Sequence, residues 1–144
     1  MKLTSKGRYA VQALADLACV QDGKPTNLNE ISLRQGISIS FLEQIFLQLK
    51  KRNLVKSLRG PSGGYILSRP SNEITLSNII EAVDEKVKTV ACKKDSKKGC
   101  NGKLTKCITH NLWDELENHI NIFLKRNTLK DILYNFDKNR NLKN

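Results

Sequence analysis

The segment between positions 27 and 59 restricts the fold of this chain more than any other feature. A short helix through Ile31, capped by Asn27 or Asn29, is predicted to stop at Gly36, because glycine commonly follows the end of a helix. A tight turn comes next, and another helix is predicted to begin at Ser40. A short helix, a glycine turn and a second capped helix together predict a helix-turn-helix.

The second helix of this pair has the clearest start signal in the sequence. Ser40 and Glu43 fit a capping box, in which each side chain accepts a hydrogen bond from the other residue's backbone N–H. The apolar residues that recur at helical spacing and should face the core are Leu42, Ile45, Phe46 and Leu49. The residues left facing solvent or a ligand are Ser38, Ser40, Glu43, Gln44, Gln48 and the run Lys50-Lys51-Arg52.

Two short strands are predicted after this helix. Residues 54–59 and 65–68 have the composition of strands, and the turn-forming segment Gly-Pro-Ser-Gly-Gly joins them into a β-hairpin. A hairpin directly after a helix-turn-helix is what a winged-helix domain needs. We therefore expect a mainly α fold with a small β-hairpin wing, in which residues 1–85 form a winged helix-turn-helix domain.

Helical patterns also lie on both sides of this pair of helices. A first helix from Ser5 to Gln21 is predicted to bury a stripe of alanine and leucine residues. Cys19, at the end of that helix, is interpreted as a small core residue rather than a functional one. A further amphipathic helix is predicted between Ile74 and Val83.

The C-terminal part of the chain is predicted to contain a long helix and a short terminal helix over residues 109–136, between a loop at 86–108 and a tail at 137–144. The apolar stripe of the long helix indicates a dimer interface, although packing against its own domain explains the pattern equally well. The stripe residues are Leu112, Trp113, Leu116, Ile120 and Phe123.

The charge of the chain limits its partners. Its 144 residues include 25 Lys and Arg against 14 Asp and Glu, a net charge of +11, which favours a polyanion such as DNA. No apolar run approaches the roughly 20 residues that cross a membrane, so we expect a cytoplasmic protein with no membrane partner. We also expect no enzyme, because the sequence has no CxxC, no nucleotide-binding glycine motif and no nucleophile beside a base.

Three cysteines and one histidine indicate a metal site. Cys92, Cys100, Cys107 and His110 supply three potential thiolates and an imidazole, which complete the coordination of a tetrahedral centre. Zinc and an iron-sulfur cluster both fit this donor set. The gaps of seven and six residues between the cysteines are longer than the short knuckles of structural zinc, and the surrounding lysines offset the charge of a thiolate-ligated cluster.

Candidate DNA contacts lie at the start of the second helix of the pair and on the wing. Ser38, Ser40 and Gln44 occupy the positions from which a recognition helix reads base edges. Glu43 can accept a hydrogen bond from cytosine N4 or act as the capping partner of Ser40, and the sequence does not favour either role. Arg59 and Gly60 lie at the predicted wing tip, where an arginine fits a narrow minor groove, and Lys50 belongs to the basic run of the helix.

Several blocks of the sequence resemble one known family. These blocks are LTSKGRYAV, ISLRQGISISFLEQIFLQLKKRNLVKSLRGPSGGYIL, IIEAVDE and the final C-x2-H-x-LW. They are similar to the Rrf2 family of bacterial winged-helix regulators over residues 1 to about 135.

The resemblance implies a homodimer that crosses the long C-terminal helices and binds double-stranded DNA at a pseudo-palindromic operator. It also implies a 2Fe-2S cluster on the four ligands named above, with the cluster-assembly machinery as its donor, and repression of cluster-assembly genes according to cluster occupancy. Relatives with this cluster usually have five residues in each cysteine gap, so the longer gaps here depart from the pattern. A zinc-containing or a nitric-oxide- or iron-responsive regulator of the same fold is the alternative.

Overall fold

The computed structural model describes residues 4–20, 23–85 and 108–142. Its elements are α1 (Ser5–Cys19), α2 (Leu28–Gln35), α3 (Ile39–Lys51), β1 (Val55–Leu58), β2 (Gly64–Leu67), η1 (Ser71–Glu73), α4 (Leu76–Ala82), α5 (His110–Arg126) and α6 (Leu129–Leu142). The predicted mainly helical fold with one β-hairpin is confirmed. Within the described ranges, no helix is long and apolar enough to span a membrane.

The hydrophobic core lies between α1, α2, α3 and α4, and Leu129 of α6 joins it. The stripes predicted for α1 and for the helix after Gly36 are both buried. Cys19 is exposed, so its assignment to the core is wrong. Nine residues make about two and a half helical turns, so position 19 lies opposite the buried Ala10 and faces away from the core.

Side-chain and glycine caps define the helix-turn-helix. Asn27 Oδ1 accepts a hydrogen bond from the backbone N–H of Glu30 at 2.9 Å, so Asn27 is the cap of α2. At the other end of α2, Gly36 takes the left-handed conformation (φ 66°) that the sequence led us to expect of a helix-ending glycine.

The start of α3 differs from the prediction. Its cap is Ser38, whose Oγ accepts from the backbone N–H of Phe41 at 3.3 Å. The predicted capping box of Ser40 and Glu43 is wrong, because Ser40 is already the second residue of the helix. The third helical residue, Phe41, has no side-chain acceptor that could complete such a box.

The hairpin is tied to the helix-turn-helix through its second strand. β1 and β2 pair antiparallel, with Val55 opposite Leu67 and Leu58 opposite Gly64. On the other edge of β2, Thr26 and Tyr65 exchange two backbone hydrogen bonds of 3.0 and 2.8 Å. The wing and the start of α2 are therefore held as one unit.

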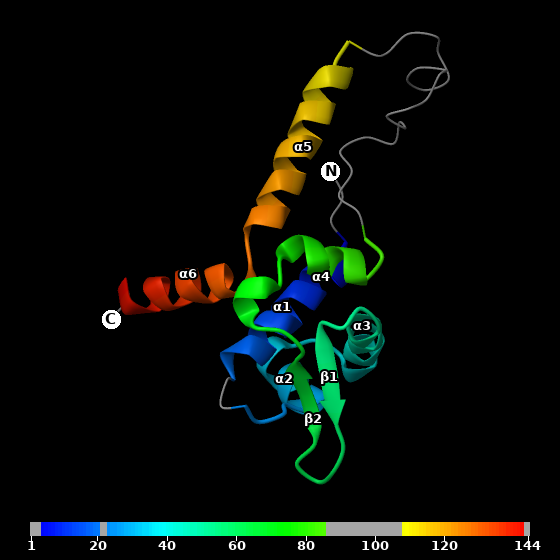
Figure 1. The fold of residues 1–144 in the computed structure, drawn as a ribbon, viewed down its shortest axis with the longest axis vertical. Coiled ribbons are helices and arrows are strands. Elements are labelled where there is room, and N and C mark those ends of the chain that lie inside the picture. The colour runs from blue at the N-terminus through cyan, green and yellow to red at the C-terminus, as the bar shows by residue number, and fades with distance from the viewer. Residues whose placement is uncertain (1–3, 21–22, 86–107, 143–144) are drawn as a thin grey trace.

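The C-terminal helices leave this unit in different directions (Figure 1). α5 projects away from the body, and its first turn lies at the end of the molecule opposite the turn of the wing. After α5 the chain is joined to the segment at the start of α4 by two backbone hydrogen bonds. The Leu76 N–H donates to the Asn127 carbonyl at 2.9 Å, and the Leu129 N–H donates to the Ile74 carbonyl at 3.0 Å. α6 continues to Leu142, so most of the stretch that we expected to be a tail is helical.

Candidate DNA interface and metal ligands

The outer face of α3 presents polar side chains at its N-terminal half. Ser40, Glu43 and Gln44 are all exposed, whereas the four predicted apolar residues of the same helix are buried. Polar residues near the start of a recognition helix are the ones that reach base edges. Glu43 has no capping role to perform here, so its exposed carboxylate is available to a ligand. Contact of these side chains with DNA stays a prediction.

Leu47 belongs to the same outer face, and the sequence analysis did not single it out. Its side chain is 56% exposed, and it follows Glu43 by about one helical turn. Apolar contact with a thymine methyl group is one of the ways in which proteins read the major groove. The sequence does indicate that Leu47 is exposed, because its position is not on the helix face formed by the buried residues Ile45, Phe46 and Leu49.

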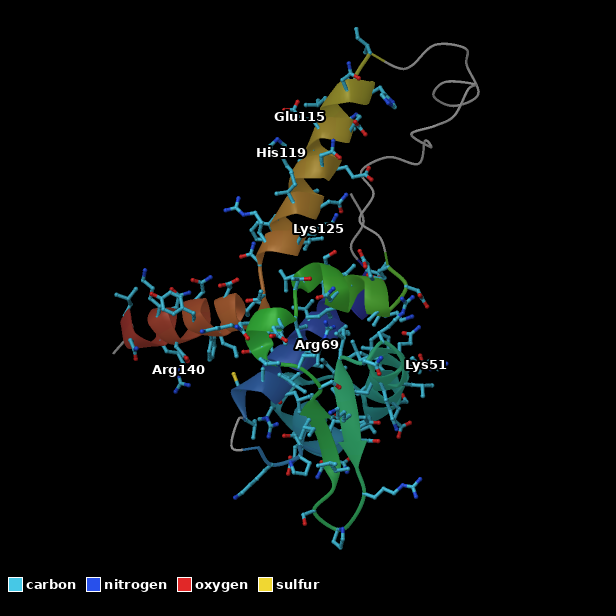
Figure 2. All side chains as sticks on the ribbon, in the orientation of Figure 1. Lys51, Arg69, Glu115, His119, Lys125 and Arg140 are labelled. Atoms are coloured by element: carbon cyan, nitrogen blue, oxygen red, sulfur yellow. The ribbon has the colours of Figure 1, made fainter. Side chains whose placement is uncertain are left out.

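The basic end of α3 is tied to the wing. Lys50 Nζ donates a hydrogen bond to Ser57 Oγ on β1 at 2.7 Å. Lys51 lies on the outer side of the helix (Figure 2) and is exposed. The two elements proposed to enter DNA grooves are therefore fixed relative to each other by a side-chain contact as well as by the chain.

The wing tip is open to a ligand. Arg59 and Gly60 are both exposed, and Gly60 has a φ of 123°, a conformation that only glycine adopts without strain. The backbone N–H of Gly63 donates to the Gly60 carbonyl at 2.9 Å and closes the turn. Arg59 thus extends from a tightly turned loop at the end of the hairpin, where it can enter a minor groove.

A buried carboxylate that the sequence analysis missed holds α2 in place. Asp16 is 6% exposed and lies on the core side of α1. Arg34 donates to it from Nη2 at 2.8 Å, and Gln35 donates from Nε2 at 2.7 Å. The hydrogen bond to Asp16 raises the pKa of the Arg34 guanidinium. The only sequence signal was an acidic residue within an apolar helical stripe.

Of the four predicted metal ligands, only His110 lies within the described residues. It is the first residue of α5 and is half-buried. Cys92, Cys100 and Cys107 lie outside the described residues. Among the side chains that the structure does place, no group of three or more His, Cys, Asp or Glu residues could hold a metal ion. The four-ligand site therefore stays a prediction.

The predicted dimer stripe of α5 is partly to largely exposed in the part of the chain that the structure describes. Leu112, Trp113, Leu116 and Phe123 are 56%, 36%, 39% and 59% exposed, and Ile120 is half-buried. At 3.6 residues per turn these five residues share one side of the helix. Contact of this stripe with a second copy of the chain stays a prediction.

Comparison with known proteins identifies the family. The model of the Rrf2 family, described as iron-dependent transcriptional regulators, matches residues 3–135. The chain belongs to the Rrf2 family. It is therefore a DNA-binding transcription regulator with the winged-helix fold and not an enzyme, as the sequence predicts.

Among its curated Rrf2 relatives are regulators named IscR. The chain is 47% identical to IscR of Pectobacterium carotovorum over 135 residues, which are 94% of this chain and 80% of that protein. It is also 47% identical to IscR of Serratia proteamaculans over 137 residues, covering 95% and 82% of the two chains. Both relatives are named as HTH-type transcriptional regulators.

Solved structures of the Rrf2 family have the same fold. IscR of T. potens superposes with a TM-score of 0.73 at 35% identity, covering 94% of this chain and 88% of that one. CymR of B. subtilis, described as the global cysteine regulator, superposes with a TM-score of 0.77 at 29% identity, covering 92% and 95%. The fold is thus shared by regulators whose names differ.

Proposed function

We propose that this regulator senses iron-sulfur clusters and represses cluster-assembly genes according to whether its own cluster is present. The observation that carries the proposal is the set Cys92, Cys100, Cys107 and His110 in a chain 47% identical to IscR regulators. The family description as iron-dependent supports the same conclusion at a coarser level.

The chemistry of this donor set fits a 2Fe-2S cluster. Three thiolates and one imidazole provide the four protein ligands that such a cluster requires, two for each iron. When bound, the cluster supplies a centre whose occupancy depends on iron and sulfide supply. His110 lies in the first turn of α5, and the lysines that neighbour the cysteines in the sequence would offset negative charge at the thiolates. The cluster-assembly machinery is the natural donor.

The proposed DNA contacts divide between two grooves. Ser38, Ser40, Glu43 and Gln44 on or beside α3 are assigned to base edges of the major groove, where their exposure supports the role. The remaining contacts are Lys50 with phosphate and Arg59 with Gly60 in the minor groove. Such a protein acts where the chromosome is, which places it in the cytoplasm of a bacterium.

Two copies are proposed to act together. One recognition helix covers too few base pairs for selectivity in a genome, so a homodimer on a pseudo-palindromic operator is required. The exposed apolar surface of Leu112, Leu116 and Phe123, on the same side of α5 as Trp113 and Ile120, supports this helix as the interface.

The test is metal and sulfide analysis of protein purified without oxygen. We expect iron and acid-labile sulfide in equal amounts and visible absorption from the cluster. The matched control is the variant in which Cys92, Cys100 and Cys107 are all replaced by Ala. A colourless wild-type protein that contains zinc instead of iron would contradict the proposal, because zinc has a filled d shell and no such absorption.

A further inference from the structure

The end of α4 is built around an aspartate in an unusual conformation. Asp84 has a φ of 58°, which places it in the left-handed region. Its backbone N–H donates to Glu81 at 3.0 Å, and the N–H of Glu85 donates to Ile80 at 3.1 Å. This pair of bonds is a Schellman motif, in which glycine is the usual residue at the left-handed position. An aspartate here accepts a conformational strain that glycine avoids.

The carboxylate of Asp84 reaches the recognition helix. Gln48 Nε2 of α3 donates to Asp84 Oδ2 at 3.3 Å. Arg52, which follows the last residue of α3, lies with its Nη2 3.8 Å from Asp84 Oδ1. In addition to the shared core, the end of α4 therefore contacts α3 through a side chain that a glycine at this position lacks.

Asp84 lies close in the sequence to the proposed metal ligands. The cysteine-bearing segment begins just after Glu85, and Cys92 is its first cysteine. α5, which begins at His110, starts at the end of the molecule opposite the wing (Figure 1). Asp84 precedes Cys92 by eight residues in the sequence, and it lies at the end of α4, where it contacts α3.

We propose that Asp84 is a positioning residue that joins the start of the cysteine-bearing segment to α3, so that cluster occupancy changes DNA affinity through its carboxylate. The inference rests on the proposed function. It adds a residue that is itself neither a proposed DNA contact nor a proposed metal ligand, and it accounts for an aspartate where a helix end favours glycine.

The decisive variant is Asp84→Gly, which removes the carboxylate and relaxes the backbone. If the role of Asp84 were only structural, this variant would be as stable as wild type and respond to the cluster as wild type does. Asp84→Asn keeps an acceptor for Gln48 and removes the charge beside Arg52. The matched control is Glu81→Gln, since Glu81 is an acid of the same helix whose side chain accepts from Ser77 on that helix.

The measurement is the affinity for a duplex selected by the wild-type protein from a random-sequence DNA pool, with and without cluster. We expect Asp84→Gly to narrow the ratio of the two affinities by about two- to five-fold, the range for an exposed charged contact. Asp84→Asn should give a smaller change, and Glu81→Gln none. The visible spectrum and the melting temperature should stay as in wild type or rise. A ratio that Asp84→Gly leaves unchanged overturns the proposal.

The metal analysis distinguishes a failure of the proposed function from a failure of the proposal for Asp84. If the wild-type protein holds no cluster, the contact is tested in metal-free protein by combining Asp84→Gly with Arg52→Gln. Effects on DNA affinity that are not additive support the positioning role. Additive effects overturn it.

Discussion

Arg34 of α2 contacts both carboxylate oxygens of Asp16 of α1, donating from Nε to Oδ2 at 3.0 Å and from Nη2 to Oδ1 at 2.8 Å. The Asp16 side chain is 4% exposed, whereas that of Arg34 is 41% exposed. A bidentate pair of this kind is geometrically specific as well as strong. The pair fixes α2, the first helix of the helix-turn-helix, to the core. The turn at Gly36 then leads from α2 into α3.

Removing this carboxylate should destabilise the fold. Asp16→Ala leaves Arg34 and Gln35 without their buried acceptor, and we expect a loss of about 1–3 kcal/mol in the free energy of unfolding. Urea denaturation measures the change. Glu73→Ala, which removes an exposed carboxylate of η1, should have little effect. An Asp16→Ala variant with the midpoint of wild type would show that the pair contributes nothing to stability.

The wing should contribute to specific DNA binding. Arg59→Ala is expected to weaken binding to a selected site by about 1–3 kcal/mol for each base that the wing can then no longer read. Affinity should fall with salt at a slope of about −0.9 per phosphate neutralised. A salt series by fluorescence anisotropy tests both, with Arg126→Ala on α5 as an equal loss of charge far from the wing. Equal binding of Arg59→Ala and wild type across the series would exclude the wing as a reader.

Charge placed in the α5 stripe should break the dimer. Leu116→Asp and Phe123→Asp each put a carboxylate on the uncovered face, where burial in an interface is costly. Ile122→Asp is the matched control, because Ile122 is 53% exposed on another side of the same helix. Sedimentation at micromolar concentration should find wild type and the control dimeric. A wild-type protein that is monomeric at this concentration would contradict the proposal that the α5 stripe forms a dimer interface.

The cap of α6 should make stability depend on pH. Asp131 Oδ2 accepts from the backbone N–H of Thr128 at 2.9 Å and from Thr128 Oγ1 at 3.0 Å, and these bonds lower the pKa of Asp131. A carboxyl with a lower pKa in the folded state contributes stability above its unfolded pKa, and that contribution is lost as pH falls through the folded value. Melting temperatures from pH 7 to pH 3 should therefore fall less in Asp131→Asn than in wild type. Parallel curves would contradict this.

The sequence predicts the order of helices and the buried stripes because these follow from apolar spacing. It also predicts the cap of α6, since Thr128 and Asp131 are spaced as in a capping box. The same rule fails at Ser40, because Ser38 offers an equivalent hydroxyl two residues earlier and the helix begins there.

Features that depend on tertiary contacts could not be read from the sequence. The pairing of Asp16 with Arg34 spans α1 and α2, and the contact of Asp84 with Gln48 spans α4 and α3. No periodicity signals such a pair in a single sequence. Cys19 is exposed although cysteine is among the most often buried residues, because its position on α1 faces away from the core.

His110 is the proposed ligand on which the sensor function depends most. A neutral imidazole donates less negative charge to iron than a thiolate does, so histidine raises the reduction potential of a cluster. A cluster with one weaker ligand is lost more readily, which suits a protein that reports cluster supply.

Variants at His110 should therefore change the cluster in opposite directions. His110→Cys is expected to keep a cluster, lower its reduction potential and slow its loss, whereas His110→Ala should give a paler protein that bleaches faster. Cys92→Ala, Cys100→Ala and Cys107→Ala should each abolish the visible absorption and leave a folded protein, because the helix-turn-helix has its own core.

Anaerobic visible spectra and bleaching rates in air compare these variants with wild type. The matched control is His119→Ala, since His119 is on the same helix, 72% exposed and 3.7 Å from Glu115 (Figure 2). It should behave as wild type, because a solvated histidine about two and a half turns further along the helix has no role at the cluster. If His110→Ala also matches wild type in colour and bleaching rate, the fourth ligand is another residue and the proposed site loses its distinguishing member.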